Sequence, residues 1–213
     1  MRALRRFHDR NRRRAERWTA GFARDADGAT AVEFAIIAVP FITIIFGILE
    51  LALVFFTGSV LTQAVSDTGR LVRVGSFQSC GGADEFKALL CARMDNLMNC
   101  EANLRVDLVS ASTFQSVTMP DPGDGGLDPD DPDSRVGNGI YTDTGPAEPV
   151  VLRGTFYYPL ILPTVMTRLE NLPGSGRHVI SVSTAFRNEP FPSGGSCNGS
   201  LGDEIQKLAR NAP

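Results

Sequence analysis

The sequence predicts an α+β protein in which a long N-terminal transmembrane helix extends into a small head with a sheet of three or four antiparallel strands. Three observations support this fold class. An apolar run long enough to cross a bilayer lies near the N-terminus. Arginine is concentrated before that run, and segments with the residue alternation of β-strands follow it.

The apolar run contains a single charged residue, Glu50, between Glu33 and Asp67. The uncharged stretches 34–49 and 51–56 together exceed the roughly 20 residues that span a hydrocarbon core. Apolar residues surround the whole helix, which argues against an amphipathic helix lying on the surface. The run is also longer than the apolar region of a cleaved secretory signal, about 7–15 residues. These features together predict one transmembrane helix.

Charge is distributed unevenly around this helix. The chain has 21 basic and 24 acidic residues, a net charge of −3, and nine of the basic residues are arginines within residues 1–24. Positive charge stays on the cytoplasmic side, so the N-terminus is predicted to be cytoplasmic. Arginine-rich segments also bind nucleic acid, but the adjoining span explains this charge and we expect no nucleic-acid partner. The expected parts are a basic cytoplasmic leader at 1–28, a transmembrane helix at 29–57 and an outer head at 58–213.

Two helices are expected in the head. Apolar residues recur at three- and four-residue steps over 60–72, so the membrane helix should continue to about Gly75 with one buried face. A second helix is predicted from about Asp84 to Asn99. Its buried face would consist of apolar residues at the same spacing, namely Phe86, Leu89, Leu90, Met94, Leu97 and Met98.

Strands are predicted at 104–108, 150–158 and 178–186, where apolar and polar residues alternate, and 112–118 would add a short strand. Helices covering one face of these strands would complete the head. Residues 119–149 are rich in proline, glycine and aspartate, and we expect them to form a flexible, solvated insertion. A calcium loop is the alternative, although the aspartates lack the usual D-x-D-x-D-G spacing. The aspartates are Asp121, Asp124, Asp128, Asp130, Asp131 and Asp133.

All four cysteines lie on the predicted outer side. An even number of cysteines in an oxidising compartment indicates two disulfides. No ligand pair has the short spacing of a zinc site, and His8 and His178 lie far from any such pair, so we expect no metal. Four cysteines permit three pairings. They are Cys80, Cys91, Cys100 and Cys197.

The residues at the membrane entry are the most informative in the chain. A basic leader ends at Gly28, and the apolar helix that follows carries a carboxylate five residues later. The sequence Gly28-Ala29-Thr30-Ala31-Val32-Glu33-Phe34 resembles type IV prepilins, whose leader is cut after the glycine, and is most similar to the Flp/Tad branch. With Pro40 and the later Phe46-Gly47-Ile48-Leu49-Glu50, it resembles the TadE-like family of minor pseudopilins. The segments 69–75 and 185–191 extend the resemblance.

This resemblance implies a bacterial inner-membrane protein with one span, a cytoplasmic N-terminus and a periplasmic, pilin-like head. Cleavage by a prepilin peptidase would fall between Gly28 and Ala29. The expected partners are other pilins or pseudopilins and the platform proteins of Tad assembly. Subunit assembly would involve Glu33, Phe34 and Glu50.

The two carboxylates in the apolar run each have two interpretations. An isolated carboxylate in lipid costs several kcal/mol unless it is paired. The α-amino group of Ala29 in a neighbouring subunit could pair with Glu33, or Glu33 could be solvated at the headgroups. Glu50 lies about 25 Å farther along the helix, near the outer edge of the hydrocarbon. There it would either reach water or face a partner.

The resemblance also favours a disulfide between Cys91 and Cys100, which leaves Cys80 to pair with Cys197. Nine residues of unbroken helix would separate the first two α-carbons by about 13 Å, whereas a disulfide needs less than about 7 Å. A bond between Cys91 and Cys100 therefore requires the second helix to end or bend between them.

No enzyme is predicted. His178 is the one histidine outside the leader, and no GxSxG, HExxH or phosphate-loop pattern is present. We expect no catalytic residue and no cofactor. The function predicted from the resemblance is that of a minor pseudopilin acting by helix packing in the membrane. The alternative is a permanently anchored periplasmic ligand-binding or envelope protein that is neither processed nor polymerised.

Overall fold

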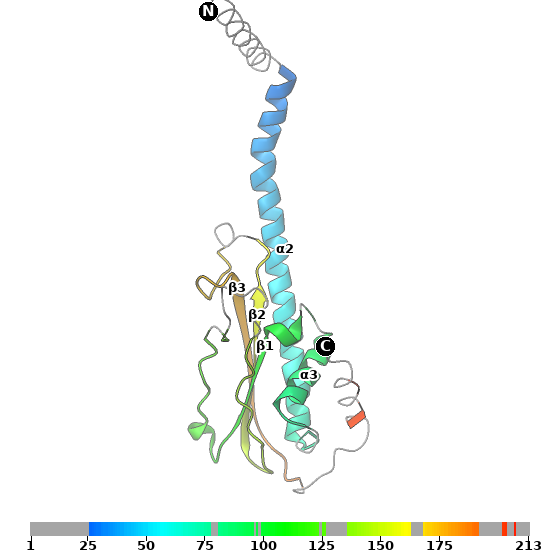
Figure 1. Ribbon diagram of the computed structural model, residues 1–213, viewed down its shortest axis with the longest axis vertical. Coiled ribbons are helices and arrows are strands. Elements are labelled where there is room, and N and C mark those ends of the chain that lie inside the picture. The colour runs from blue at the N-terminus through cyan, green and yellow to red at the C-terminus, as the bar shows by residue number, and fades with distance from the viewer. Residues whose placement is uncertain are drawn as a thin grey trace, which may run out of the picture. The chain divides into compact units, whose positions relative to one another are not determined.

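The computed structural model describes residues 26–77, 81–95, 97, 99–123, 125–126, 136–162, 168–191, 202–203 and 207. The chain divides into two compact units, Met1–Ile48 and Leu49–Pro213, and helix α2 contributes residues to both. The predicted α+β class is confirmed (Figure 1). In chain order the elements are α2 (Ala26–Arg73), α3 (Ala83–Arg93), α4 (Cys100–Asn103), β1 (Leu104–Ser110), η1 (Phe114–Ser116), β2 (Pro149–Pro159) and β3 (Arg177–Arg187).

The second unit contains an antiparallel sheet in the order β1-β2-β3, which confirms the three longer predicted strands. Figure 1 shows the three strands side by side, with β2 in the centre. The register places residues of even number on one face of all three strands. Its end pairs are Leu104↔Phe156 and Ser110↔Val150 between β1 and β2, and Pro149↔Arg187 and Pro159↔Arg177 between β2 and β3.

The hydrophobic core lies between this even-numbered face and the helices of the same unit. Leu152 and Phe156 of β2 are fully buried there. Gly154, between them, lets α2 approach closely, because a Cβ at this position would lie 2.9 Å from Cγ2 of Val65. Burial of each large apolar side chain contributes about 1.5–3 kcal/mol. The predicted stripe of α2 is confirmed by its fully buried members, Leu61, Ala64, Val65, Thr68 and Val72.

The second predicted helix is shorter than expected. Phe86, Leu89 and Leu90 are buried as predicted, but α3 ends at Arg93 and the separate turn α4 begins at Cys100. Asp95 and Asn99 have positive φ values of 52° and 54° between the two helices. Asparagine and aspartate tolerate this left-handed conformation better than most residues, and it breaks the helix. The prediction of one helix to Asn99 was therefore wrong.

This break allows the disulfide between Cys91 and Cys100, whose α-carbons are 5.6 Å apart. The pairing implied by the resemblance is thus present, and the expected end of the helix between the two cysteines is confirmed. Both cysteines are buried in the core beside the helices they connect. Cys80 and Cys197 lie outside the described residues, and their pairing stays a prediction.

The short strand predicted at 112–118 is absent from the described chain, and the helical turn η1 occupies its centre. The Ser116 hydroxyl donates to the Thr113 carbonyl at 2.8 Å and accepts from the Thr113 amide at 3.3 Å. Such local side-chain bonds offer the backbone an alternative to strand pairing. Serine and threonine in this segment therefore favoured a turn.

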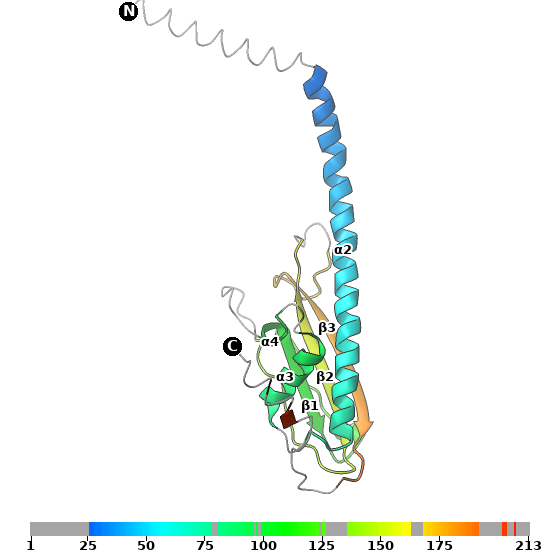
Figure 2. The same ribbon diagram turned by 90° about the vertical axis from the view of Figure 1, so that its right-hand side faces the viewer.

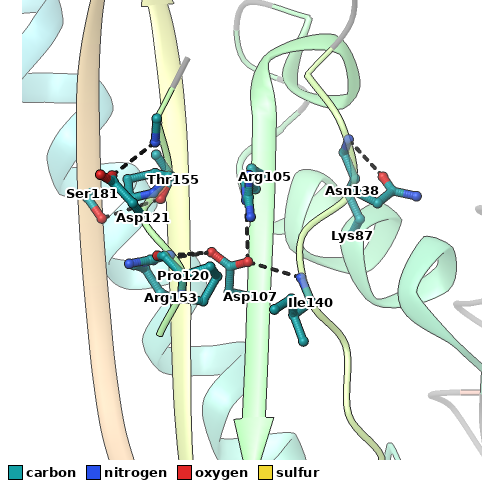
Figure 3. A network of polar contacts seen from close by, with 12 residues as sticks. Lys87, Arg105, Asp107, Pro120, Asp121, Asn138, Ile140, Arg153, Thr155 and Ser181 are labelled. Carbon is teal, nitrogen blue, oxygen red and sulfur yellow. Dashed lines mark hydrogen bonds and ion pairs between the residues drawn. The ribbon is translucent and has the colours of Figure 1, made fainter. Parts of the chain in front are cut away.

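The odd-numbered face of the sheet is mostly polar. It is covered over β1 and β2, whereas Ser181, Ser183, Ala185 and Arg187 of β3 are exposed. Asp107 of β1 is fully buried, although alternation had suggested a half-buried strand. Its Oδ2 accepts from Nη2 of Arg153 at 2.7 Å, and its Oδ1 accepts from Nε of Arg105 at 3.3 Å and from the Ile140 amide at 3.0 Å. Figure 3 shows these three donors around the carboxylate. Satisfying every acceptor offsets the cost of burying this charge.

The segment predicted as a flexible insertion contributes much of this cover. The Tyr157 hydroxyl donates to the Pro122 carbonyl at 2.8 Å, and Arg153 donates to the carbonyl of Pro120. Farther along, Leu108 exchanges backbone hydrogen bonds with Ile140 and Thr142. Parts of 119–149 therefore bond to the sheet, whereas other described residues of the segment are exposed, and the flexibility of the insertion stays a prediction. Of the six aspartates considered for calcium, only Asp121 lies among the described residues.

Gly139 is required where this segment runs alongside β1. A Cβ there would lie 2.1 Å from the carbonyl oxygen of Val106 and 2.5 Å from Oδ1 of Asp107, whereas a Cβ at Gly137 would lie an ordinary 3.6 Å from its nearest neighbour. Gly139→Ala should therefore lower the free energy of unfolding by about 1–3 kcal/mol or more. Gly137→Ala should change it by less than about 1 kcal/mol.

Urea denaturation of the detergent-solubilised chain, followed by circular dichroism, measures both variants. Equal stabilities of the two variants would contradict the close approach of Gly139 to β1.

Candidate functional site: the apolar surface of α2 and the buried Glu50

In the first unit, the described part of α2 presents an almost continuous apolar surface. Phe34 is 73% exposed and Ile37 is 69% exposed. Monomeric soluble proteins rarely expose apolar patches of such extent. The segment Thr30–Arg73 is the one described helical segment long and apolar enough to cross a membrane. The exposed apolar residues of the first unit are Val32, Phe34, Ile36, Ile37, Val39, Phe41, Ile42, Ile44, Ile45, Phe46 and Ile48.

The hydroxyl groups along this helix are satisfied within the helix itself. The Thr43 hydroxyl donates to the Val39 carbonyl at 2.9 Å, and Thr57 and Ser59 make the same contact one turn back. Polar groups in a hydrocarbon environment need internal partners because no water is present there. These hydroxyls are therefore compatible with a lipid environment.

Glu33 and Phe34 both lie on the exposed surface of α2 in the first unit. Apolar side chains flank Glu33 on either side in sequence, so its carboxylate is a charged group within an apolar surface. The backbone of Gly28 and Ala29 is helical. Their side chains and the residues before Ala26 lie outside the description, so cleavage and a subunit contact of Glu33 stay predictions.

Glu50, in the second unit, is placed differently from both expected settings. It is 3% exposed, and its Oε1 accepts from the backbone amides of Ile161 and Leu162, the latter at 3.1 Å. The carboxylate therefore binds the loop that follows β2 in its own chain. The expectation of a solvated Glu50 was wrong, because Glu50 extends the buried stripe of α2 by one turn.

That stripe could have revealed the position of Glu50. Val54 and Thr57, four and seven residues later, are both buried, and the same spacing continues to Leu61. A carboxylate at the start of a buried stripe indicates a polar contact inside the head. The donors could not be read from the pattern, since they come from a loop more than a hundred residues later.

The surroundings of Glu50 have low polarity. Within the described structure, Oε2 of Glu50 and the hydroxyl of Tyr158 are buried without a hydrogen-bond partner. Burial raises the pKa of Tyr158, and the negative charge of Glu50 raises it further. Both effects disfavour a second negative charge at this end of the sheet.

The segments 69–75 and 185–191, which extended the family resemblance, pack together in the head. Gly69 approaches Phe186, and Gly75, at a φ of 75°, leaves room for Phe191, since a Cβ there would lie 2.4 Å from the ring. The Glu189 amide donates to the Arg73 carbonyl at 2.9 Å. The late segment 185–191 therefore closes over the end of α2.

The remaining candidate residues have structural roles or lie elsewhere. His178 is partly buried in β3, and its Nδ1 contacts the Leu169 carbonyl, as expected for a structural histidine. His8 lies outside the described residues. No group of three or more metal-ligating side chains occurs in the part of the chain that the structure describes.

Glu50→Gln tests the electrostatic coupling at this site, because it keeps the shape and removes the charge. The pKa of Tyr158 should fall toward its ordinary value of about 10. Because the folded-state pKa is raised, the folded chain loses stability as pH rises above about 10, and the variant should lose less. Tyrosinate absorbance reports the pKa in a Tyr141→Phe/Tyr157→Phe background, where Tyr158 is the remaining tyrosine.

Glu101→Gln, made in the same background, is the control because Glu101 is not among the causes of the shift. An unchanged Tyr158 pKa in Glu50→Gln would contradict the coupling.

Comparison with known protein families gives a match that lies within α2. Residues 28–70 match the family model described as TadE-like protein. Searches of curated proteins and of solved structures returned no match. The matched residues include the membrane entry, the exposed apolar surface of α2 and Glu50. The chain therefore carries a TadE-like domain at residues 28–70.

Proposed function

We propose that the chain is a minor pseudopilin, a non-enzymatic component of a Tad-type pilus assembly system. The observation that carries this proposal is the TadE-like match over a helix whose apolar surface is exposed from Val32 to Phe56. Such a surface needs lipid or other apolar helices around it. Its partners would be the inner membrane, other pilins or pseudopilins, and the Tad assembly platform.

The proposed topology follows from charge and redox chemistry. The arginines of residues 1–24 would stay in the cytoplasm. The span would end near Thr57, because the exposed positions of α2 beyond it are polar, beginning with Ser59, Thr62 and Gln63. The head would then lie in the periplasm. The disulfide between Cys91 and Cys100 is compatible with that oxidising compartment.

Assembly would depend on the carboxylate of Glu33. Cleavage by a prepilin peptidase between Gly28 and Ala29 creates an α-amino group about one helical turn from Glu33. An unpaired carboxylate in lipid is costly, so its pairing with the Ala29 amine of a neighbour favours lateral packing of the helices. The exposed ring of Phe34 would pack in the same contact. Glu50 would support assembly indirectly, by holding the head in its folded form.

The mature N-terminus distinguishes this proposal from a permanently anchored envelope protein. The protein isolated from membranes of a strain with an active Tad system should begin at Ala29, as measured by mass spectrometry. Gly28→Ile should block processing and leave the arginine-rich leader attached. An intact leader in the unaltered protein would favour the anchor.

Glu33→Ala should reduce subunit association about tenfold or more. The pairing of the Glu33 carboxylate in lipid is worth several kcal/mol, and about 1.4 kcal/mol already corresponds to a tenfold change in affinity. Crosslinking in membranes and counting of pili measure the effect. Glu33→Asp should retain most of the association, since it keeps the charge.

Ile37→Ala is the matched control, because it shortens an exposed side chain of the same surface without changing charge. Normal association of Glu33→Ala would reject the proposed pairing. Association lost equally in Ile37→Ala would assign the contact to apolar packing instead.

A further inference from the structure

The loop that follows β2 combines an exposed apolar tip with a satisfied backbone. Ile161 is 70% exposed, and it lies between the partly buried Leu160 and Leu162. A large aliphatic side chain with this exposure is available for contact with lipid or with another apolar surface. Figure 2 shows this end of β2 beside α2.

Three successive amides of this loop are hydrogen-bonded inside the head. The Leu160 amide donates to the Gly176 carbonyl at 3.0 Å. The amides of Ile161 and Leu162 both donate to Oε1 of Glu50. Irregular backbone is tolerated at membrane depth when protein groups satisfy it, because water is not there to do so. By accepting from two amides of this loop, Glu50 satisfies backbone groups that would be costly to leave unpaired where water is absent.

The position of Glu50 on α2 gives the depth of the loop. In the same unit, the residues of α2 on either side of Glu50 expose their apolar side chains, with Leu49 at 53% and Leu51 at 40%. Where these side chains contact acyl chains, the loop held by Glu50 lies at the same level. The exposed side chain of Ile161 therefore lies at the level of the exposed apolar side chains of α2 around Glu50.

We propose that residues 160–162 form a second membrane contact, in which Ile161 inserts into the outer leaflet of the bilayer that α2 crosses. The head would then contact the bilayer at a second point in addition to α2. Glu50 is a positioning residue for this contact, since it holds the loop and does not itself meet lipid. The inference rests on the membrane anchoring within the proposed function.

Depth-dependent quenching of tryptophan fluorescence tests this contact in the full-length chain. Trp18 is the single tryptophan and is replaced by phenylalanine. One tryptophan is then introduced as Ile161→Trp, and the protein is reconstituted in phosphatidylcholine–phosphatidylglycerol vesicles with or without brominated acyl chains. The brominated lipid should reduce the emission of Ile161→Trp, and the emission maximum should lie to the blue of its position in water.

Two matched variants give this experiment its reference values. Phe46→Trp, in the exposed apolar part of α2, should be quenched, and Phe114→Trp, at the Ser110 end of the sheet, should not. Quenching of Phe46→Trp without quenching of Ile161→Trp would overturn the loop contact and leave the anchoring intact. Absence of quenching in both would reject the anchoring on which the inference rests.

A second substitution tests the role of Glu50. In the Ile161→Trp background, Glu50→Ala removes the acceptor of two loop amides and should reduce quenching of the tryptophan. Circular dichroism checks that the head stays folded. If quenching persists unchanged in a folded Glu50→Ala chain, the positioning role of Glu50 is rejected.

Discussion

The structure depends on the requirement that polar groups near hydrocarbon find partners within the protein. The helix α2 meets this requirement through its own backbone and through hydroxyls that bond one turn back. Its two carboxylates differ in this respect. Glu50 has donors in its own chain, whereas Glu33 lies on the exposed surface, where a partner must come from outside the described residues. Under the proposed function, that difference separates a carboxylate that stabilises one subunit from one that would join subunits.

A buried polar group also has partners within the head, where both faces of the sheet contribute to burial. Its even-numbered face buries apolar side chains against helices, and its odd-numbered face buries Asp107 with a full set of donors. Removing one partner of a buried ion pair typically costs about 3–5 kcal/mol. The segment between β1 and β2 supplies some of these contacts, so a stretch of proline, glycine and aspartate is part of the fold. Its glycine at position 139 is needed because backbone passes against backbone there.

Local patterns in the sequence predicted the elements whose partners are near or periodic. The stripe over 60–72 and the three strands follow from residue spacing, which depends on one buried face. The long apolar helix follows from the length of its uncharged run. Contacts between distant segments were not predictable in this way. The loop at Ile161 that receives Glu50 and the cover over Asp107 come from residues whose own pattern is irregular. The break after Arg93 was signalled by the disulfide and not by the helical periodicity, which continues through it.

The hydrogen bond from the Glu189 amide to the Arg73 carbonyl joins a late segment of the chain to an early one. Under the proposed topology, a chain made from its N-terminus would present α2 to the membrane before β3 exists. The central strand β2 has one neighbour until β3 is delivered, and the end of α2 stays uncovered until Phe191 arrives over Gly75. Under the proposed topology, biogenesis would therefore include an interval in which an anchored but incomplete head exposes its future core, and translocation of the last segment would end that interval.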